Sequence, residues 1–158
     1  MATEIEHKFL LRNESWQSHV YHTMWIRQGY LVSDAIRSVR VRVTDGTAYL
    51  NIKSATLGIS RSEYEYSIPL QDAGEMLDRL CDKPLLEKTR HLARYGDHIW
   101  EIDVFEGDNA GLVVAEVELA SPEENFASPP WIGKEVSHDR RYYNAYLARH
   151  PYKNWQHS

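Results

Sequence analysis

Charged residues alternate with apolar ones, position by position, along most of this chain. On a β-strand, residues two apart project from the same face. Glu4, Glu6 and Lys8 therefore share one face, and Ile5 and Phe9 share the other. The same pattern recurs in six later segments, with these charged members: Arg40 and Arg42; Lys53; Glu63 and Glu65; Lys88 and Arg90; Glu101 and Asp103; Glu116 and Glu118. Strands built this way carry paired carboxylates and paired cations on one face.

The same periodicity predicts about eight strands and two helices. Asp and Gly in segments 44–47 and 94–97 predict tight hairpins, and prolines bound a loop over 122–130 that contains a short helical turn. The predicted strands are 3–11, 24–32, 36–44, 47–54, 61–68, 85–94, 99–105 and 111–120, and the predicted helices are 72–80 and 139–149.

Composition indicates one ordinary globular domain over residues 1–158. The chain has 158 residues, of which 42% are hydrophobic and 26% are charged. Its net charge of -5 argues against nucleic acid or an anionic membrane as the main partner, because both require a basic surface. A single cysteine, Cys81, and the absence of a secretory signal favour the reducing cytoplasm. No apolar stretch approaches the length needed to cross a bilayer.

Two arrangements of the charged face are possible. In the first, an open antiparallel sheet exposes its charges to solvent, as many sheets do. Seven strands with paired charges and few neutral polar residues favour the second. There, the fold is α+β: a closed antiparallel eight-stranded β-barrel, or tunnel, with a charged lumen and helices packed outside. Because burying so many charges in a dry core is very costly, the lumen must be wet.

A lumen of this kind suits a polyphosphate carried with metal ions. Cationic side chains can neutralise phosphate oxygens, and carboxylates can hold the divalent cations that prefer oxygen ligands. The eight histidines have no spacing typical of a metal site, so they are not candidate ligands. Trp131 and the tyrosines between Tyr142 and Tyr146 are expected to pack against the apolar exterior.

The chain resembles the triphosphate tunnel metalloenzymes of the CYTH superfamily. The first strand carries Glu-x-Glu-x-Lys, as Glu4-Ile5-Glu6-His7-Lys8. Segment 13–25 matches no motif of this family. The supporting motifs follow in the family's order: Arg27-Gln28-Gly29-Tyr30-Leu31, Val39-Arg40-Val41-Arg42, Ile52-Lys53-Ser54, Glu63-Tyr64-Glu65, Glu87-Lys88-Thr89-Arg90, Glu101-Ile102-Asp103-Val104-Phe105 and Val114-Ala115-Glu116-Val117-Glu118. The ending resembles the short bacterial inorganic triphosphatases: Pro130-Trp131-Ile132-Gly133-Lys134-Glu135-Val136, then Arg141-Tyr142-Tyr143-Asn144.

The resemblance implies one or two divalent ions, Mg²⁺ or Mn²⁺, and a small polyphosphate substrate. The implied metal ligands are Glu4, Glu6, Asp103, Glu116 and Glu118, with Glu63 and Glu65 as further candidates for metal-bound water or for orienting cations. The implied substrate-binding residues are Lys8, Arg40, Arg42, Lys53, Lys88 and Arg90. A homodimer is also implied.

Three residues are candidates for the catalytic proton acceptor. Two ammonium groups that face each other across a lumen lower each other's proton affinity, so Lys53 or Lys88 could act as a neutral base. Short members of the family favour this lysine pair, and Tyr30 is a weaker candidate.

Four functions remain open at this stage. The leading hypothesis is metal-dependent hydrolysis of inorganic triphosphate to diphosphate and phosphate. The alternatives are cyclisation of ATP to cyclic AMP, hydrolysis of thiamine or nucleoside triphosphates, and binding of polyphosphate without turnover.

Overall fold

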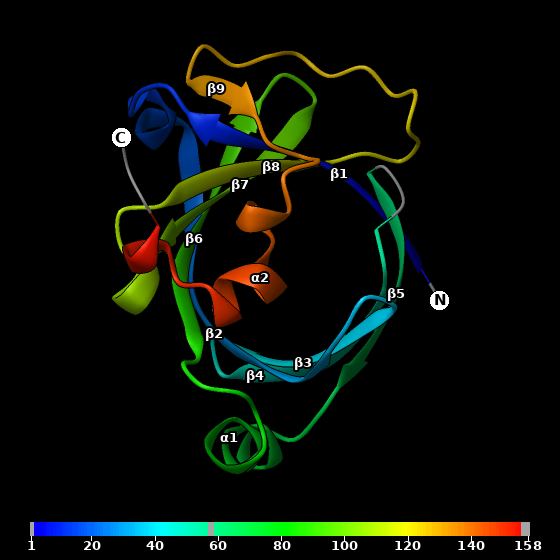
Figure 1. Cartoon of the computed structure of the whole chain (residues 1–158). Helices are drawn as coiled ribbons and strands as arrows, with labels where there is room; N and C mark the ends of the chain where they lie inside the picture. The colour runs from blue at the N-terminus through cyan, green and yellow to red at the C-terminus, as the bar shows by residue number, and fades with distance from the viewer. Residues whose placement is uncertain (1, 57–58, 156–158) are drawn as a thin grey trace.

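In the computed structural model, which describes residues 2–56 and 59–155, antiparallel strands form a ring (Figure 1). The strands of the ring follow in the order β5-β4-β3-β2-β6-β7-β8-β1, and β1 pairs again with β5, which closes the barrel. The predicted eight-stranded closed barrel is therefore confirmed within the described residues. Their bounds are β1 Ala2–Leu11, β2 Val20–Ser33, β3 Arg37–Thr44, β4 Thr47–Ser54, β5 Ser60–Ser67, β6 Leu86–Tyr95, β7 His98–Phe105 and β8 Val113–Glu118.

The hairpins form where the sequence predicts them. Asp45 and Gly46 both have positive φ, 47° and 80°, so a two-residue turn joins β3 to β4 with Thr44 opposite Thr47. This backbone fits the right-handed twist of the two strands. A second turn at Gly96, φ 60°, joins β6 to β7 and leaves Tyr95 opposite His98.

Two features at the edges of the barrel differ from the sequence prediction. A ninth strand, β9 Ile132–Glu135, pairs with the end of β1 and extends the sheet beyond the ring. β2 begins at Val20, directly after a short 3₁₀ helix, η1 Ser15–His19. Segment 13–25, which matched no motif, is thus half helical turn and half strand, and it lets β2 run alongside most of β6.

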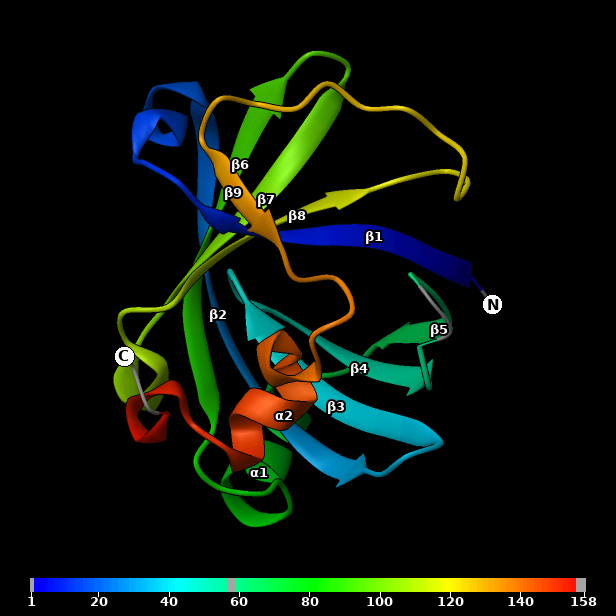
Figure 2. The ribbon, with the colours of Figure 1, turned by 45° about the horizontal axis from the view of Figure 1, so that its top comes forward.

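Two apolar clusters lie on the outside of the barrel. One cluster packs Phe9, Trp100 and Val117 beneath Trp131 and Trp16, which come from the loop before β9 and from η1. The rings of Trp100 and Trp131 meet edge to face at 5.3 Å between their centroids. Figure 2 shows the segment before β9 arching over this side of the ring. The expectation that Trp131 packs against the exterior is confirmed.

The two α-helices of the described chain take different positions. The helix α1 Leu70–Arg79 packs outside, where Ala73 and Leu77 contact Val41 and Ala48 of the wall. The helix α2 Asn144–Arg149 lies within the outline of the ring (Figure 1). The predicted exterior packing therefore holds for α1 and is wrong for α2. None of the described helices is long and apolar enough to cross a membrane.

The position of α2 follows from the composition of the lumen face. Leu86, Phe105 and Val114 lie two residues from Lys88, Asp103 and Glu116, so they continue the same inward face. At that end the face is apolar, and it packs against Leu147 and Ala148 of α2. The barrel thus has a charged section and an apolar end that α2 covers.

Gly29 of β2 is required by close packing on the outer wall. A Cβ atom at this position would lie 2.7 Å from Leu85 Cδ2 and 2.8 Å from Cys81 Cβ, in the segment that leads from α1 to β6. Contacts this short force neighbouring groups to move.

We expect Gly29→Ala to lower the free energy of unfolding by about 1–3 kcal/mol because the segment 81–85 must shift. Gly74→Ala is the matched control: nothing lies within 4 Å of its added Cβ, and alanine favours a helix interior. Urea unfolding of both variants should show loss of stability in the first and a small gain in the second. Equal stabilities would show that the outer wall tolerates a side chain at Gly29.

Candidate active site

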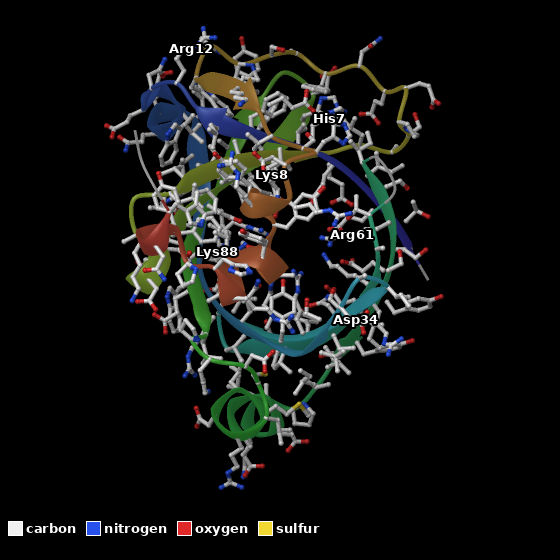
Figure 3. The ribbon with its side chains drawn as sticks, in the orientation of Figure 1. His7, Lys8, Arg12, Asp34, Arg61 and Lys88 are labelled. Atoms are coloured by element: carbon white, nitrogen blue, oxygen red, sulfur yellow. The ribbon has the colours of Figure 1, made fainter. Side chains whose placement is uncertain are left out.

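The charged section of the lumen contains a cavity of about 160 Å³ lined entirely by polar side chains. These come from seven strands and α2: Glu4, Glu6, Arg40, Arg42, Lys53, Arg61, Glu63, Glu65, Arg90, Glu101, Glu116, Glu118 and Asn144. Figure 3 shows Arg61 reaching from β5 into the opening of the ring, and Lys8 and Lys88 on its other side. The ionic side chains therefore point into the lumen, as the sequence predicts.

The strand register brings opposite charges together across the wall. Lys53 lies opposite Glu63, Lys8 opposite Glu116, and Arg90 opposite Asp103. Directly opposed residues in an antiparallel pair are near enough to interact, so each of these three cations has an acid beside it. This pairing offsets part of the desolvation cost of the charges.

Glu4 is the centre of one ionic network. Lys53 Nζ donates to its carboxylate at 3.1 Å, and Arg61 Nε donates at 2.7 Å. Lys53 Nζ also lies 3.0 Å from Glu63 Oε2. Burial alone would raise the pKa of Glu4, but Lys53 and Arg61 outweigh it and lower this pKa to about 2. Glu4 is therefore a carboxylate at neutral pH.

Asp103 is the centre of a second, deeper network. Lys88 Nζ donates to Asp103 Oδ2 at 2.7 Å, and Arg90 donates to both carboxylate oxygens at 2.8 and 3.0 Å. Burial would raise the pKa of Asp103, but the two cations hold it well below its usual range. Asp103 does not line the cavity, and cations occupy its oxygens. This placement does not favour the metal-ligand role that the resemblance gives it.

The two lysines both lose proton affinity in the fold. Burial, followed by the charges of Arg40 and Arg61, lowers the pKa of Lys53 to about 8. Lys88 is 0% exposed, and its burial lowers its pKa to about 7, with Arg90 contributing and Asp103 opposing. The main causes are thus burial and neighbouring arginines. Repulsion between the two lysines, which the sequence argument invoked, is not the main cause.

The remaining predicted residues line the cavity or lie behind it. Lys8 is buried, with its Nζ 3.3 Å from Glu116 Oε1 and donating to the Tyr142 carbonyl. Arg42 lines the cavity, and burial together with Arg40 and Arg90 lowers its pKa to about 9. Tyr30 packs in the apolar cluster under α2 and does not line the cavity.

Carboxylates outnumber cations in the cavity. Among its described lining residues, seven are glutamates and five are arginines or lysines. Burial, with Glu116 and Glu4 beside it, raises the pKa of Glu6 well above its ordinary value. Burial, followed by Glu4, Glu101 and Glu63, also raises the pKa of Glu118. For these carboxylates, burial and the neighbouring acids outweigh the nearby cations Lys8 and Lys53.

A divalent cation suits this surplus of carboxylate oxygens. No group of three histidine, cysteine or acidic side chains is already arranged as a metal site within the described part of the chain. The reason is visible for Glu4 and Glu116, whose oxygens contact Lys53, Arg61 and Lys8. Hard oxygen donors with unbalanced negative charge are what Mg²⁺ and Mn²⁺ bind, so the donor set fits.

Sequence reasoning missed several residues of the cavity. Glu101 was placed on the charged face but given no role at the site, and Arg61 was left out although it stands two residues before Glu63 in the same spacing. Asn51 is a neutral member of the lumen face that accepts from Arg40 and donates to Glu65. Asn144 comes from α2 and accepts from Lys88 Nζ at 3.3 Å, and no strand periodicity could indicate it.

Comparisons with known proteins agree with this geometry. Residues 2–143 match the CYTH domain. The chain is 46% identical over 158 residues to an inorganic triphosphatase of Acetivibrio thermocellus, covering 99% of each chain. It is 37% identical to an inorganic triphosphatase of Nitrosomonas europaea, covering 92% of this chain and 97% of the relative. The crystal structure of the inorganic triphosphatase NE1496 superposes with a TM-score of 0.66 at 35% identity, covering 94% and 95% of the two chains.

The depressed pKa of Lys88 predicts how stability depends on pH. The unfolded lysine keeps its proton up to about its ordinary pKa of 10.5, whereas the folded one loses it near 7. Unfolding between these values takes up a proton, so this lysine makes the free energy of unfolding rise with pH from about 7 towards 10. Below pH 7 both states hold the proton, and the contribution is constant.

We therefore expect the free energy of unfolding of Lys88→Met to rise less steeply with pH, between pH 7 and 9, than that of the wild type. Urea unfolding at a series of pH values, in chelator, measures the two slopes. Lys134→Met, which removes an exposed lysine of β9, controls for the loss of a lysine as such. Identical slopes for Lys88→Met and wild type would contradict a depressed pKa.

Proposed function

The chain belongs to the CYTH family, and from that membership we propose that it hydrolyses inorganic triphosphate to diphosphate and phosphate in the lumen of its barrel. The observation that carries the proposal is the mixed-sign cavity, in which four arginines and one lysine lie among seven glutamates. The cations suit phosphate oxygens, and the carboxylates suit the metal ions that accompany a polyphosphate. Two inorganic triphosphatases that align with nearly the whole chain support this reading.

We assign the substrate to the cationic half of the cavity. Arg40 and Arg42 line the cavity and can donate hydrogen bonds to phosphate oxygens, while Arg90, whose three nitrogens contact Asp103 and Glu101, adds a fixed positive charge. Lys8, which is held by Glu116 and a backbone carbonyl, adds a fixed positive charge beside them. Phosphoryl transfer depends mainly on positioning and on electrostatic stabilisation, and these preset charges can supply both.

We assign the metal to the carboxylates that face the cavity. Glu4, Glu6, Glu116 and Glu118 would hold it, with Glu63 and Glu65 nearby to orient the surrounding cations. When bound, Mg²⁺ or Mn²⁺ supplies positive charge to the phosphate oxygens and lowers the pKa of water. Asp103 would keep Lys88 and Arg90 in place rather than bind the metal directly.

Lys53 is the favoured proton acceptor. It lines the cavity, and its pKa of about 8 leaves part of the population neutral at physiological pH. Lys88 has the lower pKa, about 7, but Asp103 and Asn144 hold its Nζ behind the cavity wall. We propose that Lys88 supports the reaction by positioning Asp103 and Arg90. Tyr30, packed under α2, would support the end of the lumen.

Two narrower points belong to the same proposal. The only cysteine, Cys81, is a buried free thiol, which suits the reducing cytoplasm.

Tyr64 and Tyr66 are 39% and 55% exposed on the outer face of β5, so a second copy of the chain could cover them in a homodimer.

The first test is product analysis with triphosphate, ATP and thiamine triphosphate, each with Mg²⁺ or with chelator. We expect phosphate and diphosphate from triphosphate, only with metal present. Cyclic AMP from ATP would point to a cyclase, and metal-dependent binding without products would point to a carrier. Either result in place of triphosphate hydrolysis would refute the proposal.

A second test concerns Glu118, whose carboxylate faces the cavity and other acids. We expect Glu118→Gln to lower kcat about 10²–10³-fold, as the loss of one electrostatic group at a reaction centre typically does. The far-ultraviolet circular dichroism spectrum should not change. Glu75→Gln, on the exterior helix α1, is the matched control and should keep wild-type kcat.

A third test separates the roles of the two lysines. We expect Lys53→Ala to lower kcat about 10²–10⁴-fold with little change in KM, as loss of a general base does. It should also remove the acidic limb of the pH–rate profile. A Lys53→Ala enzyme that keeps this limb would exclude Lys53 as the base.

A further inference from the structure

Arg40 and Arg42 are held in the lumen differently from its other cations. In the described part of the chain neither forms an ion pair, and a side-chain amide accepts from the Nε of each. The other five cations of the site each lie within 3.3 Å of a carboxylate oxygen: Lys8 of Glu116, Lys53 of Glu4 and Glu63, Arg61 of Glu4, Lys88 of Asp103, and Arg90 of Asp103 and Glu101. These acids partly neutralise the five cations, whereas the two amides are neutral.

The strand register places one amide beside each of the two arginines. Arg42 of β3 lies directly opposite Gln28 of β2, and its Nε donates to Gln28 Oε1 at 2.9 Å. Arg40 lies directly opposite Asn51 of β4, and its Nε donates to Asn51 Oδ1 at 3.3 Å. Both amides are 0% exposed. Each amide therefore fixes an arginine through Nε, and the terminal guanidinium nitrogens bond to no other described residue.

Asn51 also separates Arg40 from an acid. Its Nδ2 donates to Glu65 Oε2 of β5 at 2.6 Å, while its oxygen accepts from Arg40. An amide can accept from a cation and donate to an acid at the same time, whereas an ionised carboxylate can only accept. The amide at this position thus binds both neighbours and leaves the charge of Arg40 in place.

Gln28 carries an amide that the packing of the barrel does not require. Its Nε2 is buried and has no hydrogen-bond partner among the residues that the structure describes. Across the register on β6 its neighbour is Leu86, so an apolar side chain would suit this position. A buried donor without a partner costs stability. The presence of the amide is therefore explained by its bond to Arg42.

The charge of Arg42 is not compensated within the protein. Burial, followed by Arg40 and Arg90, lowers the pKa of Arg42 to about 9, and Asp103 and Glu101 oppose this only in part. A guanidinium in such surroundings is stabilised by an anion that enters the cavity.

We propose that Gln28 and Asn51 are positioning residues that keep Arg40 and Arg42 fixed and free of acid partners, so that both arginines bind the phosphate groups of the substrate. This inference rests on the proposed function, because the anion concerned is the triphosphate in the lumen. A guanidinium held by an amide presents its full charge and both terminal nitrogens to phosphate oxygens. A carboxylate in the same place would compete with the substrate for that charge.

The test replaces the amide of Gln28 by a carboxylate of the same shape. Gln28→Glu keeps an oxygen acceptor beside Arg42 and adds one negative charge, so a purely structural role predicts no change in triphosphate binding. Gln71→Glu makes the same change on the exterior helix α1 and is the matched control. Calorimetry in chelator measures the affinity for inorganic triphosphate, and a separate assay with Mg²⁺ measures kcat and KM.

We expect Gln28→Glu to bind triphosphate about tenfold more weakly than wild type, because Arg42 then pairs with the new carboxylate. KM should rise by a similar factor, and kcat should change less. Gln71→Glu should match wild type in affinity, kcat and KM.

Gln28→Met gives a second measurement, which decides the proposal if the glutamate variant does not fold. It removes the bond to Arg42 and the unsatisfied Nε2 donor without adding charge. We expect its midpoint of urea unfolding to equal or exceed that of wild type, while its affinity for triphosphate falls about three- to tenfold. Asn51→Leu should weaken triphosphate binding to a similar extent through Arg40.

Three results would overturn the proposal: wild-type affinity in the variants of Gln28 and Asn51, equal weakening in Gln71→Glu, or a Gln28→Met protein that loses stability and keeps its affinity. The proposed function fails separately. If the wild type binds triphosphate without hydrolysing it, and Gln28→Glu weakens that binding, the hydrolase is refuted and the role of the amides stands.

Discussion

The cost of removing ionic side chains from water governs this structure. A closed barrel must place one face of every strand inside, and here that face is ionic in most of its length. Such charges are tolerable only if each has a partner or water. The register supplies partners, with Lys53 beside Glu63 and Arg90 beside Asp103, and a water-accessible cavity remains among them. The surplus of acids over bases in that cavity suits a divalent cation, and the arginines and the lysine among them suit an anionic oxygen.

Because the lumen is ionic, most apolar residues pack on the outer face of the strands. Separate clusters result: one beneath Trp131 and Trp16, and one beneath α1 with Leu77 at its centre. The lumen face becomes apolar only near Leu86 and Phe105, and there α2 packs against it. The same helix contributes Asn144 to the cavity. One short helix thus takes part both in the barrel's packing and in the lining of the ionic cavity.

The alternation of side chains could predict the barrel and most of the cavity because it is a local property of each strand. The alternation alone assigns Glu4, Lys53 and Glu116 to the lumen. Arg61 and Glu101 follow the same alternation and also line the cavity. The alternation does not show where a segment that follows the last barrel strand packs against the barrel. It could not predict β9, the entry into the ring of the helix expected over 139–149, or the role of Asn144. It also could not weigh neighbours, so it attributed the lowered pKa values of the lysines to each other, whereas burial and arginines are the main causes.

The pairing of β1 has a consequence for how the chain folds. β1 is the first strand of the sequence, yet its partners are β5, β8 and β9, so Glu6 meets Glu118 and Phe9 meets Glu135. Contacts this distant along the chain incur a large loop-closure entropy before they contribute stability, and they slow folding. During synthesis the hairpins from β2 to β5 and the hairpin of β6 and β7 can form as they emerge, and β1 can already pair with β5. Its other edge stays unpaired until β8 and β9 have left the ribosome. The strand that carries the Glu-x-Glu-x-Lys motif is therefore among the last to be enclosed, and the ionic lumen is assembled only when the barrel closes.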